Sequence, residues 1–552
     1  MNKWFKSGTP WIWLTGSAVS ISLIAVIGIF LLLGWKGLSH FWPNSVYEFS
    51  VVDQDVKQYT VIGEIYDQEI VSKQRLIASG INDLDNSKTE FTRFLIKIGN
   101  RELVDLDFVW VLETTISESV PAQDLAVFER TNNGNFYGYI ESIQEHNKTK
   151  NFSSEQFTNE LQKRIKRVAD LKEKEKLIVK KSLSKLNIAL EDNRLNKRKL
   201  ELDGLLSEQL KLDLQVERQS LHAKYLKFEQ QIDDYRSQAQ RDSVIVRDMT
   251  GAKVTLPLSN LLAVYFPNDM GLNDKITHWF NGVIDFVMDE PREANTEGGV
   301  FPAIFGTVLM VILMAIIVTP FGVLAAIYLH EYAKDNFLTK FIRISVINLA
   351  GVPSIVYGVF GLGFFVYIIG GSIDQLLYEE ALPAATFGSP GVLWAALTLA
   401  ILTLPVVIVS TEEGLSRIPG SLREASLALG ATKSETLWRV IIPMASPAIM
   451  TGLILAIARA AGEVAPLMLV GVVKMAPALP VDDIFPYLHL ERKFMHLGYH
   501  IYDVGFQSPN VEATRPLVYA TSFLLVTVII GLNLAAIALR NNLREKYKSF
   551  EH

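Results

Sequence analysis

Long apolar segments without charged residues recur along the chain and predict membrane-spanning helices. Five such segments cover residues 7–35, 298–329, 344–373, 381–411 and 516–539. A bilayer core of about 30 Å requires roughly 20 helical residues, so each segment is long enough to cross it. A sixth segment, residues 441–473, is interrupted only by Arg459 and Glu463. The pattern therefore predicts an α-helical polytopic membrane protein with six transmembrane helices.

The first apolar segment is compatible with a cleaved signal peptide or with an uncleaved anchor. Its apolar part, Ile12 to Leu33, is longer than the ~7–15 residues of an ordinary signal-peptide core, and no A-x-A-like cleavage site follows it. We therefore expect residues 1–39 to form a cytoplasmic tail and the first transmembrane helix.

Basic residues in the short loops predict that both termini are cytoplasmic. Lys and Arg precede the first span, separate spans two from three and four from five, and follow span six, whereas residues 374–390 contain none. Residues 474–515 hold four basic residues on the opposite side. The long segment 40–297 is then expected in the periplasm of a bacterial inner membrane protein.

Residues 40–297 change from strand-like to helix-like patterning and back again. Residues 46–145 and 244–265 are rich in β-branched and aromatic residues with partial period-two alternation, which predicts a β-rich domain. In residues 153–242, apolar positions are spaced by three and four, which predicts a coiled-coil seam. A polar patch before Gly204 favours an antiparallel helical hairpin, with one unbroken helix as the alternative.

An amphipathic stretch follows the second β-type segment. Ile276 to Met288 carries Trp279, Phe280 and Phe286 among polar residues, a pattern typical of helices that lie at a membrane interface. The remaining residues, 298–552, would form a membrane core of five transmembrane helices.

Composition and missing motifs exclude several functions. The 552 residues contain no cysteine, carry a formal charge of −6, and include no Gly-Lys dipeptide, so a phosphate-binding loop of the G-x4-G-K type is absent. The basic residues are dispersed, which argues against nucleic-acid binding. His496 and His500 lack a convincing third ligand, so we expect no metal site. No catalytic residue and no cofactor is predicted.

Two short polar segments in the cytoplasmic loop 417–442 carry helix-start signals. Ser421-Leu-Arg-Glu424 and Thr432-Lys-Ser-Glu435 both fit the capping box, in which a hydroxyl and a carboxylate satisfy the first amides of a helix. Gly430 stands where the first helix would need a left-handed residue to end. An ordinary helical connection would show the same signals.

The same loop resembles the EAA motif of permeases of ATP-binding-cassette (ABC) importers, E-A-A-x3-G-x9-I-x-L-P. Glu424-Ala425-Ser426, Gly430 and the stretch 440–443 preserve its spacing, with Ser426 in place of the second alanine. The resemblance implies a coupling helix that fits a cleft on a separate ATPase and contacts it through Glu424, Ala425, Ser426 and Gly430. Arg423 fits the positive-inside pattern and is a further candidate for contact with acidic groups of the ATPase.

A second block resembles the PstA-type permease subunits of the Pst phosphate importers. ARAAGEVAPLMLVG, residues 458–471, matches their ARxxGExAPL stretch, and residues 298–307, 350–362 and 422–443 support the match. The resemblance implies a type I ABC-importer core that forms half of a phosphate pathway. It does not extend to the expected periplasmic domain.

Arg459 and Glu463 are the candidate gate of that pathway. At positions i and i+4 they would share one helix face. A charged residue at mid-bilayer costs about 2.5–3.5 kcal/mol on insertion scales, so the two should face each other, a cavity or a partner. The arginine fork suits phosphate oxygens, and the glutamate could hold that fork while the pathway is empty. A purely structural pair, or one that reaches another subunit, is the alternative.

The resemblance also implies partners: a second permease of the PstC type, a homodimeric ATPase of the PstB type, a periplasmic phosphate-binding protein, and the surrounding membrane lipid. The chain itself would not hydrolyse ATP. Two other functions remain open, a permease for molybdate or sulfate, and a membrane-anchored scaffold or sensor built on residues 46–290.

Overall fold

The computed structural model describes residues 7–52, 58–79, 81, 88–99, 107–146, 148–150, 154–508 and 511–548. The first six residues, which belong to the expected cytoplasmic tail, and Ser153 at the start of the expected hairpin lie outside this part. The chain divides into two compact units, one formed by Phe41–Asp285 and the other by Met1–His40 with Phe286–His552.

Six helices in the described part of the chain are long and apolar enough to cross a membrane, which confirms the predicted number. They cover Pro10–Phe41, Phe301–Tyr332, Ser354–Leu377, Val392–Ser416, Lys433–Gly462 and Thr514–Asn542. A polytopic membrane protein is therefore the correct fold class, although the bounds of several predicted spans differ. The fourth begins at Val392 and not at residue 381.

The predicted third and fifth spans are both too long, and a proline explains each difference. Residues up to Leu349 belong to a separate helix, α9 (Phe337–Leu349), because Pro353 disfavours helical backbone in the residue before it. The third span therefore begins at Ser354. The fifth ends at Gly462, since Pro466 has no amide to bond to the Gly462 carbonyl.

Three helices form the centre of the membrane unit: α8 (Phe301–Ile327), α12 (Val392–Ser416) and α15 (Ile442–Gly462). Buried side chains from all three, including Met310, Leu399 and Ala456, form one apolar cluster. Small residues allow close contact between the helices, as in membrane proteins generally. A Cβ added at Gly322 would stand 2.6 Å from Val407, and one at Gly452 would stand 2.7 Å from Ser410.

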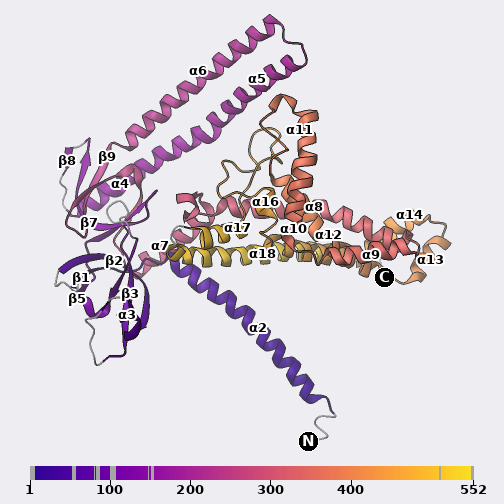
Figure 1. Cartoon of the computed structure of the whole chain (residues 1–552), viewed down its shortest axis with the longest axis horizontal. Coiled ribbons are helices and arrows are strands. Elements are labelled where there is room, and N and C mark those ends of the chain that lie inside the picture. The colour runs from indigo at the N-terminus through magenta and orange to yellow at the C-terminus, as the bar shows by residue number, and fades with distance from the viewer. Residues whose placement is uncertain are drawn as a thin grey trace. The chain divides into compact units, whose positions relative to one another are not determined.

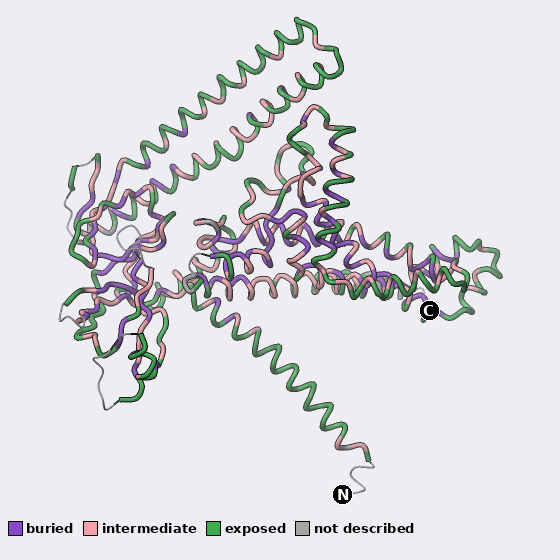
Figure 2. The backbone as a smooth tube through the Cα atoms, in the orientation of Figure 1, coloured by how far each residue is buried: buried purple, intermediate pink, exposed green. Residues whose placement is uncertain are grey.

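The first and last spans pack against each other over only part of their length. Phe30 of α2 (Thr9–Leu38) lies 4.9 Å from Phe523 of α18 (Val511–Lys548), measured between ring centroids. Figure 2 shows that the earlier part of α2 is exposed on all sides. An apolar helix with this exposure requires lipid or another subunit around it.

The unit Phe41–Asp285 contains two antiparallel sheets, which confirms the prediction of a β-rich domain. The first has the strand order β4-β3-β2-β1-β5 and the second has the order β10-β9-β7-β6-β11, with β8 paired to β7. The strands of the first sheet are β1 (Val46–Val52), β2 (Gln58–Ser72), β3 (Glu90–Lys97), β4 (Phe108–Leu112) and β5 (Ile116–Val120). Those of the second are β6 (Leu125–Arg130), β7 (Phe136–Glu145), β8 (Lys148–Lys150), β9 (Asp242–Arg247), β10 (Lys253–Pro257) and β11 (Leu261–Tyr265).

A long helical hairpin connects β8 to β9. One arm consists of α4 (Ser154–Leu177), a π-helical turn and α5 (Ser184–Leu202), and the other arm is α6 (Glu208–Ala239). The arms run side by side in Figure 1, and Asn193 of α5 donates a hydrogen bond of 2.7 Å to Glu217 of α6. The chain reverses at Gly204, whose φ of 68° is left-handed, so a single unbroken helix is wrong.

Candidate functional site

The loop between the fourth and fifth spans folds as two short helices. These are α13 (Gly420–Ala428) and α14 (Lys433–Thr436), and a π-helical turn, Leu437–Ile441, leads from α14 into α15. Both helices lie at the end of the helical bundle at which α18 ends (Figure 1). The expected helix–break–helix arrangement is therefore present.

Only one of the two predicted capping boxes forms. Glu435 accepts a hydrogen bond of 2.9 Å from the Thr432 amide, and the Glu435 amide donates one of 3.3 Å to the Thr432 hydroxyl. The box predicted for Ser421 and Glu424 is wrong, because α13 begins two residues earlier than a Ser421 cap requires and its N-cap is Pro419, which has no side-chain acceptor. Gly430 has a φ of 90° just after α13, as expected for a helix end.

The residues that match the EAA motif are accessible. Glu424, Ala425 and Gly430 are exposed, and Leu429 beside them is 90% exposed. Ser426 differs, since its hydroxyl lies 2.9 Å from the Thr436 hydroxyl and so joins α13 to α14. An alanine could not make this bond, which gives Ser426 a structural reason for replacing the second alanine of the motif.

Arg423 does not point away from the chain. Its Nη2 lies 2.8 Å from Glu331 Oε1 and donates to the Leu415 carbonyl at 3.2 Å. Glu331 belongs to a π-helical turn, Tyr328–Tyr332, that continues α8. Both side chains of the pair are mostly buried. The sequence did not point to Glu331, because no local spacing relates residues on two separate elements.

Arg459 and Glu463 do form an ion pair, although they do not share a helix face. Arg459 lies in the last turn of α15, whereas Glu463 caps the helix with extended backbone, φ −80° and ψ 131°. Arg459 Nε and Glu463 Oε1 are 3.5 Å apart, and the two side chains are 31% and 21% exposed. Among the described residues, the Arg459 guanidinium has no other ion-pair or hydrogen-bond partner. Most of its N–H groups are therefore free to bind a ligand.

A second group of polar side chains in the membrane unit was not predicted. Lys474 Nζ lies 3.1 Å from Asp503 Oδ2, and Asn295 Nδ2 donates to the same oxygen at 3.4 Å. Asp503 and Asn295 are buried. The group connects the segment before α8 with those after α16 (Leu467–Val470) and α17 (Leu497–Tyr502). Its members are far apart in sequence, so no motif could reveal it.

The two histidines near this group are buried and neutral. Burial lowers the pKa of His496 to about 4, and burial together with the Lys474 charge lowers the pKa of His500 to about 4. Within the residues that the structure describes, no group of three His, Asp or Glu side chains is arranged to hold a metal ion.

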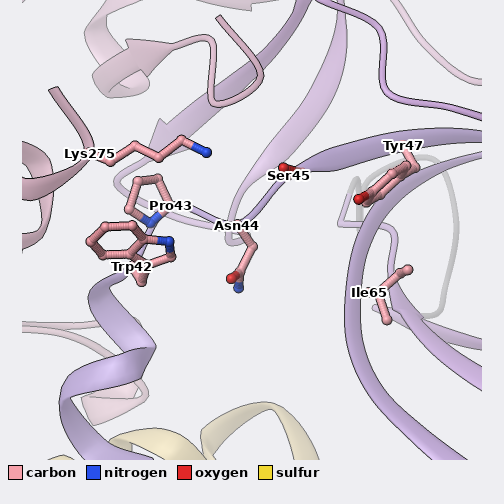
Figure 3. A pocket seen from close by; sticks show the side chains of 7 residues that line it. All are labelled: Trp42, Pro43, Asn44, Ser45, Tyr47, Ile65 and Lys275. Carbon is pink, nitrogen blue, oxygen red and sulfur yellow. The ribbon is translucent and has the colours of Figure 1, made fainter. Parts of the chain in front are cut away.

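A polar pocket of about 300 Å³ lies in the unit Phe41–Asp285. It is lined by Trp42, Pro43, Asn44, Ser45, Tyr47, Ile65 and Lys275. Figure 3 shows the Lys275 side chain extending alongside Pro43 and Trp42. The sequence did not identify this pocket.

Comparison with known proteins places the membrane unit in a transport family. A family model described as the inner membrane component of binding-protein-dependent transport systems matches residues 318–548. The probable ABC transporter permease protein YqgI of Bacillus subtilis is 32% identical over 267 residues, which are 46% of this chain and 84% of that protein. The resemblance to ABC-importer permeases is thereby confirmed.

Several relatives are phosphate transport system permease proteins. PstA 1 of Mycobacterium tuberculosis (strain H37Rv) is 38% identical over 175 residues, 32% of this chain and 51% of that protein. PstA of Pasteurella multocida is 33% identical over 186 residues, 34% of this chain and 60% of that protein. The chain thus spans just over half the length of these relatives. Among solved structures, an inward-facing MetNI methionine ABC transporter is 18% identical over 44% of this chain and 94% of that chain, with a TM-score of 0.33.

Proposed function

Because the chain belongs to the family of inner membrane components of binding-protein-dependent transport systems, we propose that it is the permease subunit of an ATP-driven phosphate importer. It forms half of the translocation pathway and carries out no chemical reaction. The PstA relatives support phosphate as the cargo.

The proposal is supported most directly by the burial and the contacts of Arg459. Its guanidinium is half-buried at the end of a membrane span and is held by one long contact with Glu463. A planar fork of free N–H groups suits phosphate oxygens, and a low-affinity site lets the ion leave again. Glu463 offsets the positive charge while the pathway is empty. Together the two residues act as an electrostatic gate.

ATP hydrolysis takes place on a separate homodimeric ATPase of the PstB type. The ATPase receives the exposed face of α13, with Glu424, Ala425 and Gly430 in the contact. Closure of the ATPase moves α13 and α14 as a unit, because the hydrogen bond between Ser426 and Thr436 joins them. Arg423 transmits this motion within the chain instead of contacting the ATPase, since Glu331 already holds it.

The remaining partners follow from the same family. A second permease of the PstC type completes the pathway, and a phosphate-binding protein delivers the ion from the periplasm. With both termini cytoplasmic, residues 40–297 lie in the periplasm. The exposed faces of the spans contact lipid or the second permease.

Phosphate uptake by cells that lack other phosphate transporters tests this function. Arg459→Ala should abolish most uptake at normal membrane levels, and Arg459→Lys should restore only part of it, because lysine lacks the planar fork. Arg417→Lys, which changes an exposed arginine, is the matched control. Full uptake in both Arg459 variants would contradict the proposed role of Arg459 and Glu463 as a gate.

Competition distinguishes the cargo. Excess sulfate or molybdate should leave uptake of labelled phosphate unchanged. Strong competition by either oxyanion would support a permease for that ion instead. Normal uptake after deletion of the entire chain would support a membrane-anchored scaffold or sensor.

A further inference from the structure

One helix of the described chain carries an uncovered apolar stripe. In α7 (Leu272–Met288), the side chains of Leu272, Ile276, Phe280 and Ile284 are 68%, 47%, 57% and 41% exposed. Positions four apart lie near one another on a helix surface, so these side chains form one continuous stripe. Monomeric soluble surfaces rarely leave such a patch open, which indicates an occupant.

The other sides of α7 are different in character. Asn281 and Asp285 are polar and exposed, whereas Phe286 is buried. The helix therefore has an apolar exposed side, a polar exposed side and a side packed on the protein. This division is typical of a helix that lies in the plane of a membrane interface.

Contacts within the chain tie α7 to residues that adjoin two membrane spans. Gly282 lies against the side chain of Phe41, which is the last residue of the first membrane span. At the end of α7, the Val300 amide donates to the Phe286 carbonyl at 2.8 Å, and the Phe301 amide donates to the Asp289 carbonyl at 3.2 Å. Phe301 begins the second span. The helix is thus tied to the residues at which the chain leaves the membrane and enters it again.

We propose that the stripe of α7 is buried in the acyl chains of the bilayer at the boundary where the first span ends. Under the orientation proposed above, this is the outer leaflet. Amphipathic interfacial helices bury their apolar face to a depth of about 5–10 Å, and the four large side chains of the stripe form such a face.

The neighbouring pocket supports a lipid occupant over a protein one. Trp42 and Lys275 line it together, and Figure 3 shows the lysine stem extending alongside Pro43 and Trp42. Tryptophan is enriched at the level of lipid headgroups. A lysine can keep its amine in water while its stem covers apolar surface. Both residue types therefore fit a position just above the acyl chains.

The lack of cysteine in the chain makes a direct test simple. The variants Phe280→Cys and Asn281→Cys of the full-length protein are each labelled with an environment-sensitive fluorophore. Each labelled protein is then placed in nanodiscs made of lipids with brominated acyl chains. Emission from position 280 should be quenched roughly threefold more than emission from position 281, because bromine quenches only at close range within the acyl region. Ile24→Cys, on the exposed part of the first span, calibrates full lipid contact.

A second pair of variants protects the result against local misfolding. Ile284→Cys and Asp285→Cys form the same apolar and polar neighbours one turn further along. Preferential quenching at 280 and 284 supports the proposal. Equal quenching within both pairs overturns the proposal. It is also overturned if neither bromine nor aqueous iodide quenches the labels at 280 and 284, a result that would indicate a protein partner. None of these readouts depends on transport, so the result is independent of the proposed function.

Discussion

Arg423 of α13 and Glu331 at the end of α8 form an ion pair of 2.8 Å between Nη2 and Oε1. The same arginine nitrogen donates to the Leu415 carbonyl of α12 at 3.2 Å. One side chain therefore connects α13 to α12 and to the turn that continues α8. Glu331 lies in a π-helical turn, a feature that is frequent at functional sites. Under the proposed function, this pair passes motion of α13 to the membrane core.

Reversal of one charge should uncouple the ATPase from transport. Arg423→Glu places two carboxylates together, so the contact between the two elements is lost. A loss of about 1.4 kcal/mol in coupling energy corresponds to a tenfold effect, so phosphate uptake should fall by roughly tenfold. Uptake and ATP hydrolysis are measured on the same preparation. Hydrolysis should persist while uptake falls. The double variant Arg423→Glu/Glu331→Arg should recover much of the uptake, because the pair is restored in reverse.

The control for this prediction is Arg417→Glu, which changes the charge of an exposed arginine in the same loop. It should leave uptake nearly unchanged. If Arg417→Glu is as harmful as Arg423→Glu, or if the double variant is worse than either single variant, the pair does not transmit motion.

The base of the helical hairpin should depend on a buried carboxylate. Asp242 lies 3.0 Å from Arg164 and 3.0 Å from Arg167, both on α4, and its side chain is fully buried. Asp242→Asn removes the ion pair with Arg167 and the shortest of the three described carboxylate contacts of Arg164, and should destabilise this region by about 3 kcal/mol. Hydrogen exchange of the α4 and β9 amides in the full-length protein measures the effect. Exchange should accelerate there and stay unchanged in the membrane spans.

The same carboxylate predicts a pH dependence. Burial raises the pKa of Asp242, but the hydrogen bond from Arg241 and the charges of Arg167 and Arg164 outweigh burial and lower it overall. Its contribution to stability is therefore fully present above the unfolded pKa of about 3.9 and is lost as the pH falls through the lower folded value. Protection of α4 and β9 should drop in that acidic range in the native chain. In Asp242→Asn this drop should be smaller, and an identical pH profile would argue against the role of Asp242.

Two glycines in one π-helical stretch, Gly361–Gly370, should respond differently to alanine. A Cβ at Gly361 would overlap the Thr398 hydroxyl of α12, whereas a Cβ at Gly363 would meet nothing within 4 Å. Gly361→Ala should lower the free energy of unfolding by about 1–3 kcal/mol. Gly363→Ala should be neutral or slightly stabilising, because alanine loses less backbone entropy. Thermal unfolding of both variants in detergent compares them, and equal melting temperatures would contradict the close contact between the third span and α12.

The spans, the β-type segments and the Thr432 capping box could be predicted because each leaves a local pattern in the sequence. The bounds of the third, fourth and fifth spans were wrong. In the third and fifth, hydropathy does not register that Pro353 and Pro466 interrupt the helices. The motif at 424–430 pointed to α13 as the candidate coupling helix, yet it could not reveal the contacts that hold α13. Glu331, Asn295 and Asp503 meet their partners only after the spans have packed, so no spacing in the sequence indicates them.

The Arg459–Glu463 pair shows that sequence spacing can predict which residues are neighbours without predicting the backbone between them. An i,i+4 spacing predicts neighbours on one helix face. The residues are indeed neighbours, but Glu463 reaches Arg459 from extended backbone after the helix has ended. The carboxylate is therefore attached to the segment that leads to Pro466, and movement of this segment would change its distance from the arginine.

Simultaneous measurement of labelled phosphate transport and ATP hydrolysis tests the central proposal most directly. Vesicles contain the chain with its partner permease, the ATPase and the binding protein, and ATP is supplied only on the side of α13 and α14. The proposed function predicts that labelled phosphate crosses only when ATP is present and in proportion to the ATP hydrolysed. Phosphate that crosses at the same rate without ATP, or hydrolysis that proceeds with no phosphate movement, would contradict it.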